Sequence, residues 1–120
     1  MKLIYPAHSK HYFYFRMHIS QFVLQQGCVP LNPFMIFEYF MLDTVNRDVI
    51  RAANNTMVER ADEVWVFGPV SNGVLAEIRL AKKLKKPIRY FSIVKSRTIE
   101  ETTKDTVELE EDVARFKDEL

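Results

Sequence analysis

One acidic side chain, Glu77, has a position that could support chemistry. The run from Gly73 to about Lys86 predicts a helix that Pro87 ends. Glu77 lies near the middle of an arc that is otherwise apolar and consists of Val74, Ala76, Ile78, Leu80, Ala81 and Leu84. A carboxylate on the inner side of a helix needs a partner or a cavity, so the pattern indicates a group that faces a ligand. Alternatively, Glu77 leans back toward free backbone N–H groups or solvent.

The loop before this helix, Pro69 to Gly73, could hold an anion. Ser71 or Asn72 can cap the helix, and the N–H groups and the dipole of a helix start attract phosphate. Caps of this kind begin most helices, so a purely structural role fits equally well.

Three polar residues, His8, Lys10 and His11, follow the first predicted strand. They could add positive charge or a proton donor to a site, although polar loop residues are also commonly inert. The histidines show no spacing with acidic residues or with Cys28 that indicates a metal site, so no metal is expected.

The elements that must position these residues alternate along the chain. Expected strands cover residues 2–7, 28–31, 63–67 and 88–94, and expected helices cover residues 12–26, 43–60, 73–86 and about 106–120. This alternation indicates an open parallel sheet with helices on both faces. If the strand order is 2-1-3-4, the ligand crevice lies between the carboxyl ends of strands one and three. The loops 5–11 and 68–73 then face each other, with Glu77 pointing between them.

Two helices and one turn signal carry more detailed expectations. The inward face of the helix over 43–60 is expected to contain Val45, Val49, Ile50, Ala53 and Met57. The last helix is expected to align Leu109, Val113, Phe116 and Leu120. Thr98 to Glu101 fits a capping box, and the basic run from Lys82 to Arg89 fits a solvated helix face.

The segment FMIFEYFML, residues 34–42, is rich in aromatic residues and methionine. Glu38 interrupts it and it is far too short to cross a bilayer. Contiguous apolar surface tends to be covered, so a subunit interface, a position over a ligand and an ordinary core helix are all compatible with it.

The composition excludes several classes of protein. The chain has 17 basic and 16 acidic residues and a net charge of +1, so neither a nucleic-acid polymer nor a membrane surface is an expected partner. Cys28 is the single cysteine and cannot form an internal disulfide. Met1-Lys2 leads into a strand-like run and not into a signal peptide, so a reducing, cytoplasmic location is expected.

Several of these residues together resemble the nucleoside 2-deoxyribosyltransferase family, including its relatives that hydrolyse nucleoside 5′-monophosphates. The resemblance covers roughly residues 1 to 94, and its most specific part is the S-x-G-x-x-x-E pattern from Ser71 to Glu77. The other matching features are Tyr5, Ala61-Asp62, Ala81 and Lys86-Pro87. The resemblance implies a three-layer α/β/α, Rossmann-like or flavodoxin-like fold with an open, mainly parallel sheet of four or five strands. Residues 1–120 would form one such domain, with residues 95–120 as a charged helical extension.

The resemblance also implies an activity and a set of site residues. Glu77 would be the nucleophile that attacks the anomeric carbon, expels the base and leaves a glycosyl ester for water or a second base to resolve. Ser71 matches the serine that binds phosphate in the monophosphate-hydrolysing branch, whereas the transferase branch often has an acid there. The substrate-binding residues would be Tyr5, His8, Ser71, Asn72 and Gly73. No cofactor is implied, and a homodimer or higher homo-oligomer is expected because a neighbouring subunit completes the family's site.

Asn54 departs from the family pattern. The family usually has an aspartate at this position, eight residues before the Asp62 equivalent, which serves the leaving base. An amide can hold the edge of a base but cannot exchange a proton at neutral pH. Asp43, Asp48 or His8 would then supply the proton, or the chain would be a nucleotide-binding or sensing module with little turnover. A structural assembly protein built on residues 34–42 is a third interpretation.

Overall fold

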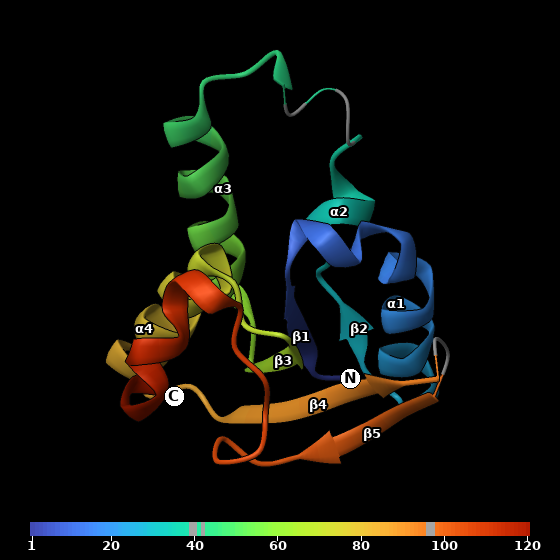
Figure 1. Ribbon diagram of the computed structural model, residues 1–120. Helices are drawn as coiled ribbons and strands as arrows, with labels where there is room; N and C mark the ends of the chain where they lie inside the picture. Colours follow the sequence, from blue (N-terminus) through green and yellow to red (C-terminus); the bar gives the residue numbers. More distant parts are fainter. Residues whose placement is uncertain (39–40, 42, 96–97) are drawn as a thin grey trace.

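A five-stranded sheet with the order β2-β1-β3-β4-β5 forms the centre of the molecule (Figure 1). The computed structural model describes residues 1–38, 41, 43–95 and 98–120. The strands are β1 (Leu3–His8), β2 (Val29–Pro30), β3 (Glu63–Gly68), β4 (Ile88–Val94) and β5 (Thr98–Thr102). The first four strands run parallel, and β5 pairs antiparallel with β4. The predicted order, and a mainly parallel sheet of four or five strands, are therefore confirmed.

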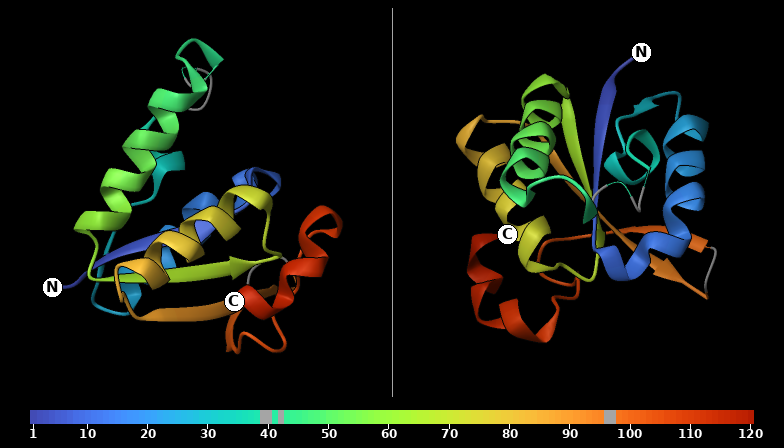
Figure 2. Two further views of the ribbon diagram at one scale, coloured as in Figure 1. Left: turned by 90° about the vertical axis from the view of Figure 1, so that its left-hand side faces the viewer. Right: turned by 90° about the horizontal axis from the view of Figure 1, so that it is seen from above.

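Helices cover both faces of the sheet, which confirms the predicted three layers (Figure 2). The 3₁₀ helix η1 (Lys10–Phe15) and α1 (Arg16–Gln25) lie on one face, and α4 (Asn72–Lys83) lies on the other. Strand β3 shows why both faces need cover. Val64 and Val66 belong to the core cluster under α4, whereas Trp65 and Phe67 belong to the cluster under α1. All four side chains are buried, as predicted for a central parallel strand.

Helix α4 is shorter than predicted, and its buried face is turned slightly. Its N-cap is Ser71, and it ends at Lys83, before Lys85, which has a positive φ of 58°. The buried residues of the helix are Val74, Leu75, Ile78 and Ala81, whereas Ala76 is exposed. Lys82, Lys83 and Lys85 are exposed, as predicted for a solvated face, but Lys86 is not. The Lys86 ammonium donates hydrogen bonds to the carbonyls of Ala61 and Glu59.

Helix α3 (Arg47–Arg60) begins four residues later than predicted, after the N-cap Asn46. Its predicted inward face is confirmed at Ala53 and Met57, which are partly buried, with Met57 packed against the core, but not at Val49. Val49 is 57% exposed, and the fully buried residue of the helix is Val58 in its last turns. The cause is visible in Figure 1, where α3 rises beyond the ends of the strands. Its first turns therefore have no sheet to pack against, and only its C-terminal part joins the core.

The described part of the segment 34–42 does not form a core helix. Helix α2 (Pro33–Ile36) covers only four residues, and Met35 and Ile36 are about half exposed. Tyr39, Phe40 and Leu42 lie outside the described residues. No helix in the described part of the chain is long and apolar enough to cross a membrane.

The C-terminal segment differs from its prediction. Thr98 to Thr102 forms strand β5 and no capping box, and the last helix is the 3₁₀ helix η3 (Glu111–Glu119), which starts later than predicted. The segment packs on α4, where Arg79 donates two hydrogen bonds to Glu119 at 2.6 and 2.8 Å. Val113 and Leu120, two of the predicted inward residues, are buried in the core.

The C-terminal segment is also fixed to the loop that follows β3. Val70 donates a hydrogen bond to the Glu108 carbonyl and accepts one from the Glu110 N–H, both at 2.7 Å. Val107 packs closely over Gly68, where an added Cβ would lie 2.6 Å from a Val107 methyl group. This contact requires glycine at position 68 and brings Glu110 to the carboxyl end of β3.

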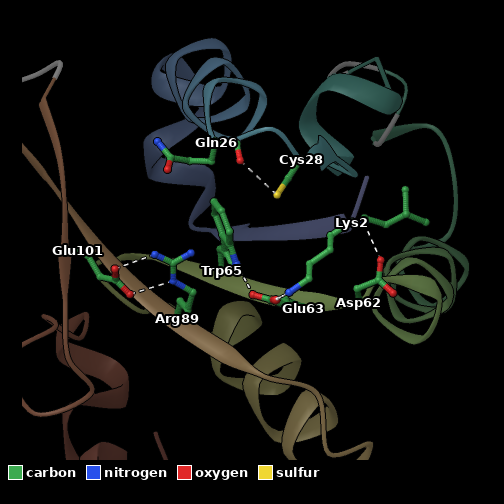
Figure 3. Close-up of polar contacts among 9 residues, drawn as sticks. Lys2, Gln26, Cys28, Asp62, Glu63, Trp65, Arg89 and Glu101 are labelled. Carbon is green, nitrogen blue, oxygen red and sulfur yellow. Dashed lines mark hydrogen bonds and ion pairs between the residues drawn. The ribbon is translucent and has the colours of Figure 1, made fainter.

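The amino end of the sheet carries a network of paired charges (Figure 3). Glu63 accepts hydrogen bonds from Lys2 at 2.7 Å and from the Trp65 indole at 3.0 Å. The guanidinium of Arg89 lies 4.7 Å from the Trp65 ring centroid and donates two hydrogen bonds to Glu101. The Lys2 hydrogen bond is the main cause that lowers the pKa of Glu63. Each of these charges therefore has a partner of opposite sign.

Candidate active site

A cavity of about 620 Å³ lies at the carboxyl ends of β1 and β3, where the order of the strands predicts a ligand site. Its walls come from the loop after β1, from α2 and α3, from the start of α4 and from the C-terminal segment. All seven site residues predicted from the sequence line it, namely Tyr5, His8, Asn54, Ser71, Asn72, Gly73 and Glu77. The structure thus brings the predicted residues together in one place.

Glu77 lies in the second turn of α4 and contacts Tyr5 of the neighbouring strand. The buried Tyr5 hydroxyl donates a hydrogen bond to Glu77 Oε2. Burial raises the pKa of the Glu77 carboxyl from 4.5 to about 7, and the Tyr5 hydrogen bond opposes this rise. Burial, together with the Glu77 charge, raises the pKa of Tyr5 well above 10, so this hydroxyl stays protonated. The Glu77 side chain thus lines the cavity, and burial shifts the pKa of its carboxyl group towards neutral pH.

The start of α4 presents a hydroxyl and backbone N–H groups to the cavity. Ser71 Oγ accepts a hydrogen bond from the Val74 N–H at 3.2 Å, so its own proton is available to a ligand. Asn72 and Gly73 open the helix, where N–H groups have no partner within the helix. This arrangement suits an anion or the oxygen atoms of a sugar.

His8 is buried and contacts residues that hold the elements around the cavity in place. Its ring nitrogens lie 3.3 Å from the Ser9 carbonyl and from Asn32 Oδ1, and its ring contacts the Phe34 ring at a tilt of 34°, with the centroids 4.7 Å apart. Burial lowers the pKa of His8 to about 4, so the ring is neutral at pH 7. Asn32 in turn caps α2 by accepting a hydrogen bond from the Phe34 N–H. His8 therefore positions α2 and does not supply the positive charge suggested from the sequence.

Helix α3 presents one stripe of residues to the cavity, Arg47, Ile50, Arg51 and Asn54. Their spacing of three, four and seven residues places them on one side of a helix. Asn54 Oδ1 is buried, and it has no hydrogen-bond partner among the described residues. Sequence reasoning considered only apolar residues for the inner face of α3, so it identified Ile50 and missed the two arginines on the same stripe. The polar spacing that ends at Asn54 could have revealed them.

The proposed sources of a proton differ in their position. Asp43 lines the cavity, whereas Asp48 does not and its side chain is 89% exposed. His8, with its pKa of about 4, is a poor proton donor at neutral pH. Of the three, Asp43 is thus the acid that the cavity contains.

The C-terminal segment adds two acidic residues, Glu110 and Asp112, that sequence reasoning also missed. Glu110 Oε2 lies 3.1 Å from Nδ1 of His11, which connects the segment to the loop after β1. Lys10 lines the same cavity. No group of three or more His, Cys, Asp or Glu side chains that could hold a metal occurs within the described part of the chain.

The comparisons with known proteins agree with the fold. Residues 5–91 match the family model described as a domain of unknown function, DUF7768. The structure is similar to that of a 2-deoxyribosyltransferase from Bacillus psychrosaccharolyticus, with 16% identity, a TM-score of 0.57 and coverage of 78% of this chain and 77% of that chain. It is also similar to a 2-desoxiribosyltransferase from Leishmania mexicana, with 18% identity, a TM-score of 0.57 and coverage of 83% and 79%. No curated protein matches the sequence. At these identities the likeness confirms the fold that the sequence resemblance implied.

Proposed function

This chain belongs to the DUF7768 family, and we propose that it cleaves the N-glycosidic bond of a nucleoside or a nucleoside 5′-monophosphate. The observation that carries this proposal is the Glu77 carboxyl group, which faces a cavity of substrate size and is held by the Tyr5 hydroxyl. The fold shared with two 2-deoxyribosyltransferases adds support.

In this mechanism the Glu77 carboxylate attacks C1′ of the sugar. The C1′–N bond breaks, its electron pair stays with the base, and a glycosyl ester forms on Glu77 until water or a second base resolves it. The negative charge also favours the positively charged, oxocarbenium-like transition state in a site with little water. Tyr5 orients the carboxylate and remains a donor, because its raised pKa keeps it protonated. Activity should rise as the pH passes about 7, where Glu77 ionises.

The start of α4 would hold the 5′ end of the substrate. The Ser71 hydroxyl and the N–H groups of Asn72 and Gly73 are donors at a helix start, which suits a phosphate dianion. Lys10 lines the same cavity and offsets part of the negative charge of Glu110 and Asp112. We infer that residues 1–120 work as one domain, because the C-terminal segment contributes to this cavity.

A second copy of the chain would cover the apolar residues beside the cavity. Met35, Ile36, Met41 and Val49 are each at least 41% exposed, and they come from α2, α3 and the segment between them. We therefore infer a homo-oligomer, at least a dimer, in which the partner helps to enclose the substrate. Light scattering at micromolar concentration would test this, and a monomer would contradict it.

Asn54 favours a second candidate function, a nucleotide-binding or sensing module. Because an amide cannot donate a proton to a leaving base, turnover on this scaffold could be very slow. Calorimetry that shows tight nucleotide binding, with no base released over long incubation, would favour this function over catalysis.

The test of catalysis is release of free base from a panel of nucleosides and nucleoside 5′-monophosphates, followed by chromatography. We expect release by the wild-type protein, a glycosyl adduct on the peptide with Glu77 by mass spectrometry, and no release by Glu77→Ala. Glu59→Ala, on the exposed side of α3 and outside the cavity, is the matched control. Release that is unchanged in Glu77→Ala would remove the proposed nucleophile.

A further inference from the structure

We propose that Arg47, Arg51 and Asn54 bind the base, and that the preferred substrates carry an oxo base, in which a ring carbonyl stands beside a ring N–H. The base would leave as an anion that the two guanidinium groups stabilise. This inference rests on the proposed function and names the substrate class and the base-binding residues of the same cavity.

The position of α3 places these three side chains on one wall. Arg51 lies three residues from Asn54, or about 4.5 Å along the helix axis, so both can reach the same planar ligand. Ile50 lies on the same stripe, and Phe34 of α2 lines the cavity as well. Helices α2 and α3 stand on opposite sides of β1 (Figures 1 and 2). The cavity thus contains two apolar side chains, Phe34 and Ile50, that can contact a flat ring, beside the polar groups of α3.

The polar groups of α3 match the edge of an oxo base. Asn54 Oδ1 is a buried acceptor with no partner in the described part of the chain, and burying it is costly unless a ligand N–H fills the gap. The arginines supply donors, which pair with carbonyl oxygens and ring nitrogens, often two at a time. An oxo base such as hypoxanthine offers both an N–H and a carbonyl. Adenine places an amino donor where the arginines need an acceptor.

The arginines are available for this role. The Arg51 guanidinium lies 3.9 Å from the Asp48 carboxylate, and both side chains are mostly exposed, so the pair is weak and easily exchanged for a ligand. The described residues include no carboxylate within ion-pair distance of Arg47. The wall of the cavity that α3 forms thus carries two cations and, at position 54, no acid.

The positive charge of Arg47 and Arg51 takes the place of the proton that Asn54 cannot donate to the leaving base. When the C1′–N bond breaks, a Glu77 oxygen bonds to C1′ and the electron pair of the broken bond stays on the base. Under this proposal neither Asn54 nor Asp43 protonates the base as it leaves, so that pair becomes a negative charge, which an oxo base spreads onto its carbonyl oxygen. Guanidinium groups fixed at that edge stabilise the charge as it develops. The water that later hydrolyses the ester gives its hydroxyl to C1′ and its proton to the base.

Matched substrates that differ only in the base test the proposal. We expect the wild-type protein to cleave the hypoxanthine nucleotide with a kcat/KM about tenfold or more above that of the adenine nucleotide. Arg51→Gln should lower kcat/KM for hypoxanthine about tenfold to a hundredfold, with less effect on adenine. Arg47→Gln should act in the same direction. Arg60→Gln, on the same helix but outside the cavity, is the control that should change nothing.

Calorimetry with the free bases gives a second readout that needs no turnover. Hypoxanthine should bind more tightly than adenine, and Arg51→Gln and Asn54→Leu should remove that difference while circular dichroism shows a folded protein. Binding that follows this pattern without any base release would refute the proposed function and leave the base preference standing. Equal turnover or equal affinity for the two bases, or an Arg51→Gln protein that behaves like Arg60→Gln, would overturn the inference.

Discussion

Acidic side chains at the two ends of the central sheet have different kinds of partner. At the amino end, Glu63 pairs with Lys2, and Arg89 pairs with Glu101 (Figure 3). At the carboxyl end, Glu77 has a neutral phenol as its partner and Asn54 Oδ1 has none among the described residues. The same type of side chain therefore has a lowered pKa at Glu63 and a raised pKa at Glu77. Charged partners stabilise the fold at the amino end, whereas Glu77 and Asn54 have no charged partner among the described residues and can face a ligand.

The sharpest test of this contrast applies one substitution at both ends. Under the proposed mechanism, Glu77→Gln should lower base release by about 10⁴-fold or more, because the nucleophile is lost while the size of the side chain is kept. Glu63→Gln should leave release unchanged, since it lies outside the cavity. Single-turnover chromatography of the two variants measures this. Equal loss in both would show that the two ends do not differ in this way.

Substitutions at Gly68 and Gly73 test whether the C-terminal segment is fixed at the loop that follows β3. Gly68→Ala should lower the free energy of unfolding by about 1–3 kcal/mol, because the new methyl group would meet Val107 at 2.6 Å. Gly73→Ala should leave stability nearly unchanged, since its nearest neighbour would be Ser71 Oγ at 4.0 Å. Urea unfolding of both variants measures the difference. A Gly68→Ala protein as stable as the wild type would mean that Val107 moves aside freely.

The pH dependence of stability should have opposite signs at the two ends. The folded-state pKa of Glu77 is raised from 4.5 to about 7, so its protonated form stabilises the fold below about pH 4.5, and this stability is lost as the pH rises through 7. Glu77→Gln should therefore be more stable than the wild type at pH 8, by about 2 kcal/mol, and similar at pH 4. Glu63 has a lowered pKa, so its smaller contribution is present above its unfolded-state pKa and is lost as the pH falls.

Urea unfolding of the wild type, Glu77→Gln and Glu63→Gln at pH 4 and pH 8 measures both effects on the free energy of unfolding. A Glu77→Gln protein that is no more stable than the wild type at pH 8 would contradict a raised pKa at this position.

The smallest effect is expected from Tyr5→Phe. Its hydrogen bond favours the charged form of Glu77, so removing the hydroxyl should raise the pKa of Glu77 further above 7. The midpoint of the pH profile of kcat/KM would move upward, and release at pH 7 would fall by roughly threefold to tenfold. An unshifted midpoint would show that Tyr5 does not tune the carboxyl group.

Local patterns were enough to predict the four parallel strands and the group of residues around Glu77, but not the antiparallel strand β5. The buried run of β3, the cap at Ser71 and the helical spacing up to Glu77 each depend on neighbours in the sequence. The order of strands then brought Tyr5 to the same cavity. These parts could be predicted because periodicity and turn residues reflect local burial.

The remaining parts depend on contacts that no local pattern contains. Which side of α3 faces the cavity depends on how the helix extends beyond the ends of the strands. No local pattern contains this information, so Arg47 and Arg51 were missed. Glu110 reaches the cavity because Val70 pairs with residues 108 and 110, about forty positions away in the sequence. Charge runs alone also suggested a solvated face where Lys86 in fact binds two backbone carbonyls.

The C-terminal segment, which Val107 fixes against Gly68, also forms part of the rim of the cavity. The match to the family ends at residue 91, whereas Glu110 and Asp112 lie beyond it and still border the cavity. This part of the rim is thus supplied by a stretch of chain separate from helix α4 and strand β1, which present Glu77 and Tyr5. Substitutions after β5 could therefore change which substrates enter the cavity without moving Glu77 or Tyr5.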